Sequence, residues 1–130
     1  MLNKKISTLA KGLLILHSLV ALGYGISILA NPDDIAAFMG LQIISTDGLA
    51  ELYVMYLGLS GAMSLFMLFG AFREKWLGTA LFFLVLSMSG ITSARLISAL
   101  FLETGYYTNH SLYYDIPVTF LAWFAYWKLK

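Results

Sequence analysis

Residues 77–102 have the sequence LGTALFFLVLSMSGITSARLISALFL, an apolar run in which Arg95 is the single charged residue. A membrane-spanning α-helix needs about 20 mostly apolar residues to cross a hydrocarbon core about 30 Å thick. This stretch meets that requirement and predicts a transmembrane helix. Further long apolar stretches lie on both sides of it, so the sequence indicates a membrane protein with several spans.

The composition of the whole chain agrees with a membrane protein. Its 130 residues are 60% hydrophobic and 12% charged, and the mean hydropathy is +0.81. A soluble domain carries about 25% charged residues, so the excess apolar surface must face lipid. The length indicates one domain over residues 1–130. The absence of cysteine excludes disulfide scaffolds and thiol chemistry, and a net charge of +1 gives no reason to expect a nucleic-acid partner.

Three further spans complete a predicted four-transmembrane-helix bundle. Two of them cover about residues 12–29 and 49–72. A fourth helix that began at Pro117 would reach only about 18 Å. A start near Asn109 or Ser111, with one of these as N-cap, gives a near-full span over about residues 111–128. Pro117 then lies inside the helix and Asp115 lies within the membrane.

The basic residues predict the orientation of this bundle. Seven of the eight Lys and Arg residues lie before the first span, between the second and third, or at the end of the chain. With an even number of crossings, these three regions share one face. The opposite face, residues 30–48 and 103–111, contains acidic residues and no Lys or Arg. The positive-inside rule therefore places both termini in the cytoplasm.

The first outer loop predicts a short helix that lies at the membrane surface. Asn31 is a suitable N-cap, and Pro32 suits the first helical position. Asp33 and Asp34 complement the positive end of the helix dipole, and Gly40 is a suitable terminator.

Arg95 is the most informative polar residue, because it lies well inside the third span. A charge in hydrocarbon costs at least about 2.5–3.5 kcal/mol and needs a partner or water. Glu51 in the second span and Asp115 in the fourth lie at a similar depth. One guanidinium can serve two carboxylates. We therefore predict a polar cluster of these three residues that opens toward the outer leaflet.

Other polar side chains at compatible positions predict a cavity around this cluster. Tyr56 on the second span is a further candidate binding residue, and Tyr24 on the first span lies at similar depth. Thr92 and Ser98 flank the arginine at helical spacing, and Thr119 lies one turn from the acid of the fourth span.

A purely structural interpretation of the same residues stays open. Glu51 could complement a helix N-terminus, Asp115 could cap a shorter fourth helix, and Arg95 with one acid could orient two helices. His17 is interpreted as a hydrogen-bonded interior histidine in the inner half, away from the acids. Because His17 and His110 lack metal-ligand spacing, no metal site is predicted.

Several short motifs resemble a known family. They are Pro32 and Gly40-Leu41 in the first outer loop, ELYVMYLG over residues 51–58, Arg95-Leu96, and the acid Asp115. Together they resemble a bacterial family of small four-helix membrane proteins of unknown function, in the wider DoxX-like group. The resemblance implies the same fold and a bacterial inner-membrane location, without an established reaction.

The chain departs from the pattern of that family at three positions. The family typically shows Glu, then Arg two residues later, then Tyr-Gly-Gly. Here Tyr53 stands in place of the Arg and Leu57 in place of the first Gly, whereas Glu51, Tyr56 and Gly58 agree. The acid of the last helix is usually Glu, where this chain has Asp.

Three functions are compatible with these features. The first is binding of a lipophilic molecule, or a role as accessory subunit of a larger membrane complex. Some relatives in the wider group look like subunits of quinone-linked oxidoreductases, which makes a quinone a candidate ligand, although no cofactor is predicted. The second is an enzyme that uses Glu51 or Asp115 as acid–base on a lipid-like or quinone substrate. The third is a charge cluster that only stabilises the fold. A transporter is disfavoured, because no continuous polar route crosses the inner half.

Overall fold

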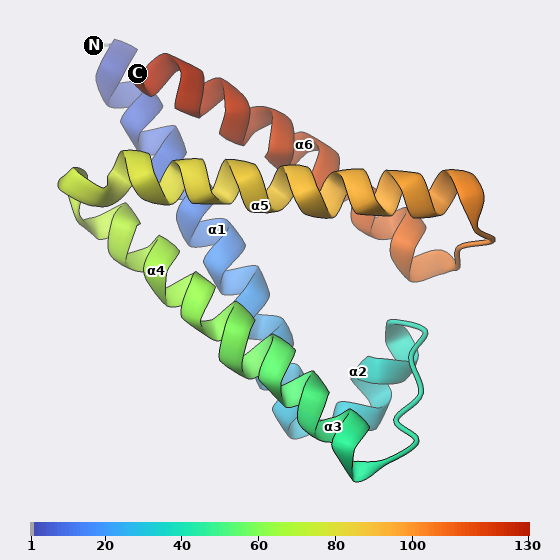
Figure 1. The fold of residues 1–130 in the computed structure, drawn as a ribbon. Coiled ribbons are helices and arrows are strands. Elements are labelled where there is room, and N and C mark those ends of the chain that lie inside the picture. The colour runs from blue at the N-terminus through green and yellow to red at the C-terminus, as the bar shows by residue number, and fades with distance from the viewer. Residues whose placement is uncertain (1) are drawn as a thin grey trace.

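The computed structural model describes residues 2–130, with the side chains of residues 4–130, and over this range it contains helices and no strand (Figure 1). The elements in chain order are α1 (Leu2–Ala30), α2 (Pro32–Phe38), α3 (Thr46–Tyr53), the π-helical turn η1 (Val54–Leu59), α4 (Ser60–Phe72), α5 (Glu74–Phe101) and α6 (Tyr106–Leu129). Because α3, η1 and α4 follow one another without a break, they form one long rod. The prediction of an all-helical chain is confirmed.

Three stretches of helix are long and apolar enough to cross a membrane: Lys4–Ala30, Thr46–Phe72 and Glu74–Phe101. They correspond to the first three predicted spans, each extended at its N-terminal end. The prediction of four such helices is too high by one. Helix α6 has 24 residues, which is long enough, but its first half contains Asn109, His110 and Asp115 and is too polar to qualify by composition.

The start of α6 differs from the prediction. Its N-cap is Gly105, and neither Asn109 nor Ser111 caps the helix. Asn109 lies in the first turn, where its Nδ2 donates to the carbonyl of Thr104 at 3.3 Å and its Oδ1 accepts from the Thr104 hydroxyl at 3.0 Å. The asparagine therefore fixes the loop before the helix, and the helix begins earlier than predicted. Pro117 does lie inside α6, as expected.

The short helix predicted in the first outer loop is present as α2. Pro32 is at its start, and Asp33 and Asp34 lie in its first turn. Asn31 precedes the helix but makes no side-chain capping bond. Gly40 has φ +76°, a left-handed conformation that favours glycine and ends the helix.

The long helices form two antiparallel pairs (Figure 1). Helix α1 packs mainly against α4, and α5 mainly against α6. The pairs meet near the turn between α4 and α5 and separate toward the other end of the molecule, while both termini lie together at the closed end. The buried core lies mostly near this closed end and includes Ala10, Leu14, Ala71, Leu81, Leu84 and Ala125.

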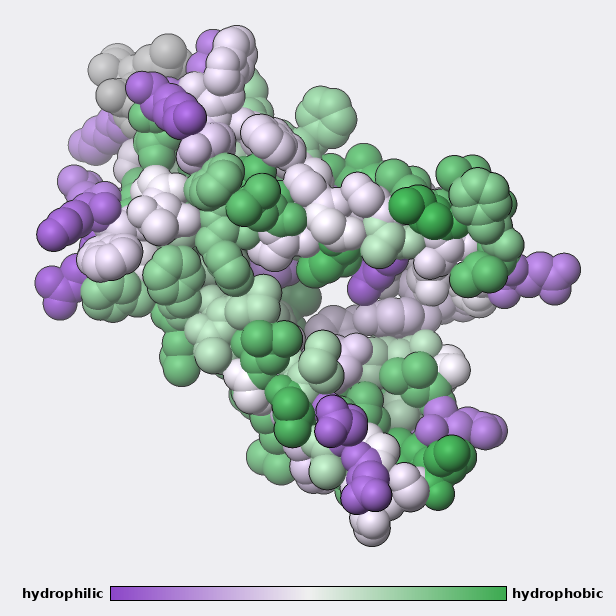
Figure 2. Space-filling view, in the orientation of Figure 1, coloured by the Kyte–Doolittle hydropathy of each residue, from purple (hydrophilic) through white to green (hydrophobic). Residues whose placement is uncertain are grey.

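Apolar side chains cover much of the outer surface of the helices. Leu19, Phe72, Leu100 and Phe120 are all more than half exposed. Figure 2 shows apolar side chains over the long helices, polar ones at the ends, and a hollow between the two helix pairs. Three helices that can cross a membrane, together with this apolar surface, indicate a membrane protein.

Candidate functional site

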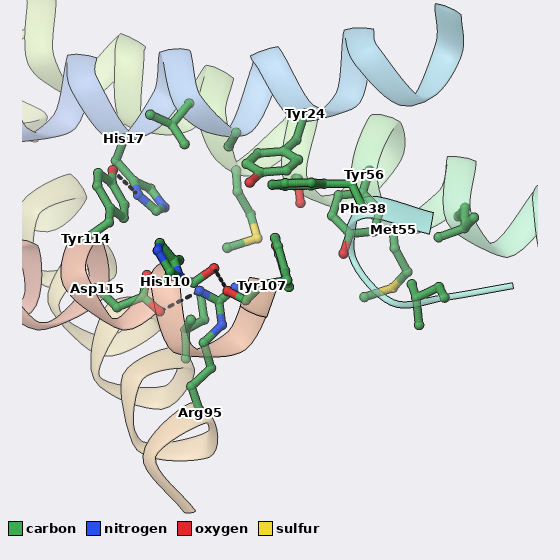
Figure 3. Close-up of a pocket in the computed structure, with 18 of the residues that line it drawn as sticks. His17, Tyr24, Phe38, Met55, Tyr56, Arg95, Tyr107, His110, Tyr114 and Asp115 are labelled. Carbon is green, nitrogen blue, oxygen red and sulfur yellow. Dashed lines mark hydrogen bonds and ion pairs between the residues drawn. The ribbon is translucent and has the colours of Figure 1, made fainter. Parts of the chain in front are cut away.

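A cavity of about 860 Å³ fills the space where the two helix pairs separate. Its lining residues come from α1, α2, the rod of α3, η1 and α4, and from α5 and α6. The walls combine apolar and polar side chains, and Figure 3 shows several of them pointing into the same space. Residues that line it include His17, Tyr24, Phe38, Glu51, Met55, Tyr56, Met63, Met67, Met88, Arg95, Tyr107, Tyr114 and Asp115.

An ion pair between α5 and α6 forms the most polar part of the cavity wall. Arg95 Nη1 lies 2.7 Å from Asp115 Oδ2, and the two side chains are 27% and 5% exposed, respectively. The guanidinium carbon also lies 5.4 Å from the centroid of the Tyr107 ring. The short distance is that of a charge-assisted hydrogen bond, which accounts for the burial of the carboxylate.

Two of the predicted neighbouring residues, Thr92 and Thr119, form hydrogen bonds between α5 and α6 near this ion pair. The hydroxyls of Thr92 and Thr119 lie 2.8 Å apart, and Thr92 is 3.4 Å from the backbone carbonyl of Asp115. Neither threonine lines the cavity, and Ser98 does not line it either. The threonines therefore pack α5 on α6, and the third predicted neighbour lies outside the site.

Glu51 lines the cavity but stands apart from the ion pair. Among the side chains that the structure describes, the ion pairs are Arg95–Asp115 and Lys11–Glu74, so Glu51 forms none. It belongs to α3, whose rod diverges from α5. The structure thus brings together two members of the predicted cluster and leaves the third as an exposed carboxylate on another wall.

The π-helical turn η1 shapes the wall that holds Tyr56. A Cβ built on Gly25 of α1 would come within 2.8 Å of the Tyr56 carbonyl oxygen, so only glycine allows this close approach. The π turn inserts one residue into the helical period. Leu52, Tyr56 and Ser60 on this rod line the cavity, and Leu59 does not. Tyr24, the residue before Gly25 on α1, lines the same cavity.

The position of His17 differs from the prediction that it lies away from the acids. Its Nδ1 lies 3.1 Å from the Tyr114 hydroxyl, and both residues line the cavity (Figure 3). The histidine is hydrogen-bonded, as interpreted, but it is not remote from the acids. Because Tyr114 precedes Asp115 on α6, one segment of that helix contacts both His17 and Arg95.

The first half of α6 supplies four cavity residues, of which Tyr107 and His110 lie in the segment 103–111 that was predicted to lie outside the spans. Tyr107, His110, Ser111 and Tyr114 all line the cavity. Their spacing of three, four and seven residues is that of one helical face. This spacing can be read from the sequence, but the predicted helix began at residue 109 or 111 and so did not include Tyr107.

A comparison with protein families identifies the chain. The family model of a domain of unknown function, DUF4345, matches residues 9–111. The chain belongs to this family. No curated protein and no solved structure matches it.

The DUF4345 match covers only part of the cavity wall. It includes Glu51 and Arg95 but ends before Tyr114 and Asp115. Within the described residues, no group of three His, Asp or Glu side chains is placed to hold a metal ion. The arrangement of apolar walls with an ion pair and several hydroxyls is suited to holding a molecule that has both apolar and polar parts.

Proposed function

We propose that this DUF4345 protein binds an amphiphilic, lipid-like molecule in the cavity between its two helix pairs. The observation that carries the proposal is the cavity itself, about 860 Å³ in volume, whose lining combines apolar side chains with an ion pair, a carboxylate and several hydroxyls. Small-molecule sites have volumes of about 300–1,000 Å³ and use a few polar groups to fix orientation. A quinone, the ligand class that the resemblance to DoxX-like proteins implied, is one molecule of this kind.

The apolar walls suit a flexible chain. Four of the six methionines, Met55, Met63, Met67 and Met88, line the cavity. Methionine has three rotatable bonds and a polarizable sulfur, so it adapts to irregular apolar ligands. Met67 and Met88 are 1% and 0% exposed, respectively, and mark the side of the cavity that borders the core.

We expect Ala21→Phe to abolish a co-purifying adduct in native mass spectrometry of protein extracted gently from its own membrane. Ala21 lines the cavity, so a phenylalanine there takes the space of the ligand. The matched control is Leu19→Phe, because Leu19 is 59% exposed on the outer surface of the same helix. An adduct that survives in both variants would lie outside the cavity and would contradict the proposal.

The proposed membrane arrangement has four spans, with α6 as the fourth and both termini cytoplasmic. A helix of 24 residues is about 36 Å long. Its polar residue Asp115 is buried against α5, whereas Phe120 and Trp127 are at least 70% exposed and suited to contact lipid. Burial of the charge between helices removes the cost of exposing it to hydrocarbon. The two termini lie at the same end of the molecule, which supports an even number of crossings (Figure 1).

Single cysteines in this cysteine-free chain test the arrangement. We expect Asp47→Cys to react with an impermeant thiol reagent added to intact bacterial cells, and Lys75→Cys and Lys130→Cys to react only after permeabilisation. All three positions are exposed. Labelling of both Asp47→Cys and Lys130→Cys in intact cells, with Lys75→Cys protected, would show that α6 does not cross. Labelling of Lys75→Cys and Lys130→Cys, with Asp47→Cys protected, would reverse the orientation.

A further inference from the structure

We infer that the polar end of the bound molecule is positively charged, so that the ligand is a lipophilic amine or quaternary ammonium compound. This inference rests on the proposed binding function and names the class of its ligand. It follows from two properties of the cavity wall, the balance of its charges and the arrangement of its aromatic rings.

The charged side chains of the wall favour a cation. Arg95 is the one Lys or Arg among the lining residues, and this guanidinium is already paired with Asp115 at 2.7 Å. Glu51 is left as a carboxylate that lines the cavity without an ion-pair partner among the described side chains. The surrounding segments, residues 30–48 and 103–111, add acidic residues and no Lys or Arg. An anionic head group would therefore meet repulsion, whereas a cation would be attracted.

The aromatic side chains of the wall suit the same ligand. Tyr24, Tyr56, Phe38 and Tyr107 come from four different elements and surround one space (Figure 3). Phe38 and Tyr107 meet edge to face with centroids 5.5 Å apart. Aromatic faces attract cations, and cages of such rings bind quaternary ammonium groups.

Arg95 already makes a cation–π contact with one of these rings, Tyr107, and we propose the same kind of contact for the ligand. Its guanidinium carbon lies 5.4 Å from the centroid of Tyr107. In the described structure no cation is placed over Tyr24 or Tyr56. These two rings and the Glu51 carboxylate line the same cavity and form the proposed ammonium subsite, and the methionine-lined region holds the alkyl chain.

Three probes with the same chain and different head groups test the inference. The wild-type protein in nanodiscs is titrated with decyltrimethylammonium, decanol and decanoate, and adducts are quantified by native mass spectrometry. We expect the ammonium probe to bind about tenfold more tightly than decanol, and decanoate to bind more weakly than decanol. Glu51→Gln and Tyr56→Leu should each remove most of this preference while decanol still binds, which shows that the variants remain folded.

Asp47→Asn is the matched control, because Asp47 is an exposed carboxylate on the same helix that does not line the cavity. Retention of the preference in this variant supports the subsite. Equal loss in Asp47→Asn and Glu51→Gln would assign the preference to general surface charge and overturn the inference. Equal binding of all three probes would overturn it as well, while the proposed binding function would stand. If no probe binds the wild-type cavity, the binding function fails and the inference fails with it.

Discussion

Arg95→Met is expected to lower the free energy of unfolding by about 3–5 kcal/mol, because it leaves the Asp115 carboxylate buried without its partner. The carboxylate is 5% exposed and lies 2.7 Å from the guanidinium in the wild-type structure. Removing one member of a buried ion pair exposes the other to its full desolvation cost. Unfolding in mixed SDS micelles, followed by tryptophan fluorescence, measures the change.

Two variants separate loss of the pair from loss of charge in general. The double variant Arg95→Met/Asp115→Leu should recover most of the lost stability, since replacing a whole buried pair by apolar side chains is often neutral. Glu103→Gln should unfold like the wild type, because Glu103 is exposed and forms no ion pair among the described side chains. If Arg95→Met alone were as stable as the wild type, the ion pair would not hold α5 to α6.

The ion pair could be predicted from the sequence because its two residues lie at similar depth on helices that follow each other in the chain. Arg95 and Asp115 lie on consecutive helices, and antiparallel neighbours of this length bring residues of equal depth side by side. The argument from Pro117 also placed the acid inside the fourth helix, where the structure has it. The cost of a lone charge in hydrocarbon then made a contact between the two residues the expected outcome.

The position of Glu51 could not be obtained in the same way. Glu51 does line the cavity, but an equal depth along the helices does not fix which helices touch. The rod that contains Glu51 packs against α1 and separates from α5 toward this end. That separation depends on close packing at the opposite end of the helices, a long-range property that local apolar patterns do not encode.

The π turn and the start of α6 were missed for local reasons. No residue of Val54–Leu59 is a glycine or proline except Gly58, and the six residues look like ordinary apolar helix. On α6, Asn109 has the chemistry of an N-cap but uses its side chain to bond Thr104 in the preceding loop. The earlier start of α6 puts Tyr107 and His110 on a helical face that lines the cavity, whereas the prediction left both residues outside the fourth span.

The close packing that sets the angle between the helix pairs lies at Gly70 of α4. A Cβ built on Gly70 would fall against the Cβ of Ala80 on α5 and within 3.3 Å of the Trp76 carbonyl oxygen. Ala80 is 0% exposed, so it has no room to move aside. Small residues at such a crossing let two helix backbones approach closely, which is the usual basis of helix packing in membranes. The two helices diverge from this contact toward the cavity.

We therefore expect Gly70→Val to destabilise the protein by about 3 kcal/mol, because the added side chain forces α4 and α5 apart at their tightest contact. Gly78→Val is the matched control: a Cβ at Gly78 of α5 meets nothing within 4 Å, and the change should alter stability by less than about 0.5 kcal/mol. Unfolding in mixed SDS micelles compares the two variants under the same conditions. Since the cavity opens from this crossing, Gly70→Val should also reduce the co-purifying adduct, whereas Gly78→Val should retain it. Equal stability of the two variants would mean that the Gly70–Ala80 contact does not hold the helix pairs together, and the angle between them would then have to be set by the α1–α6 contact.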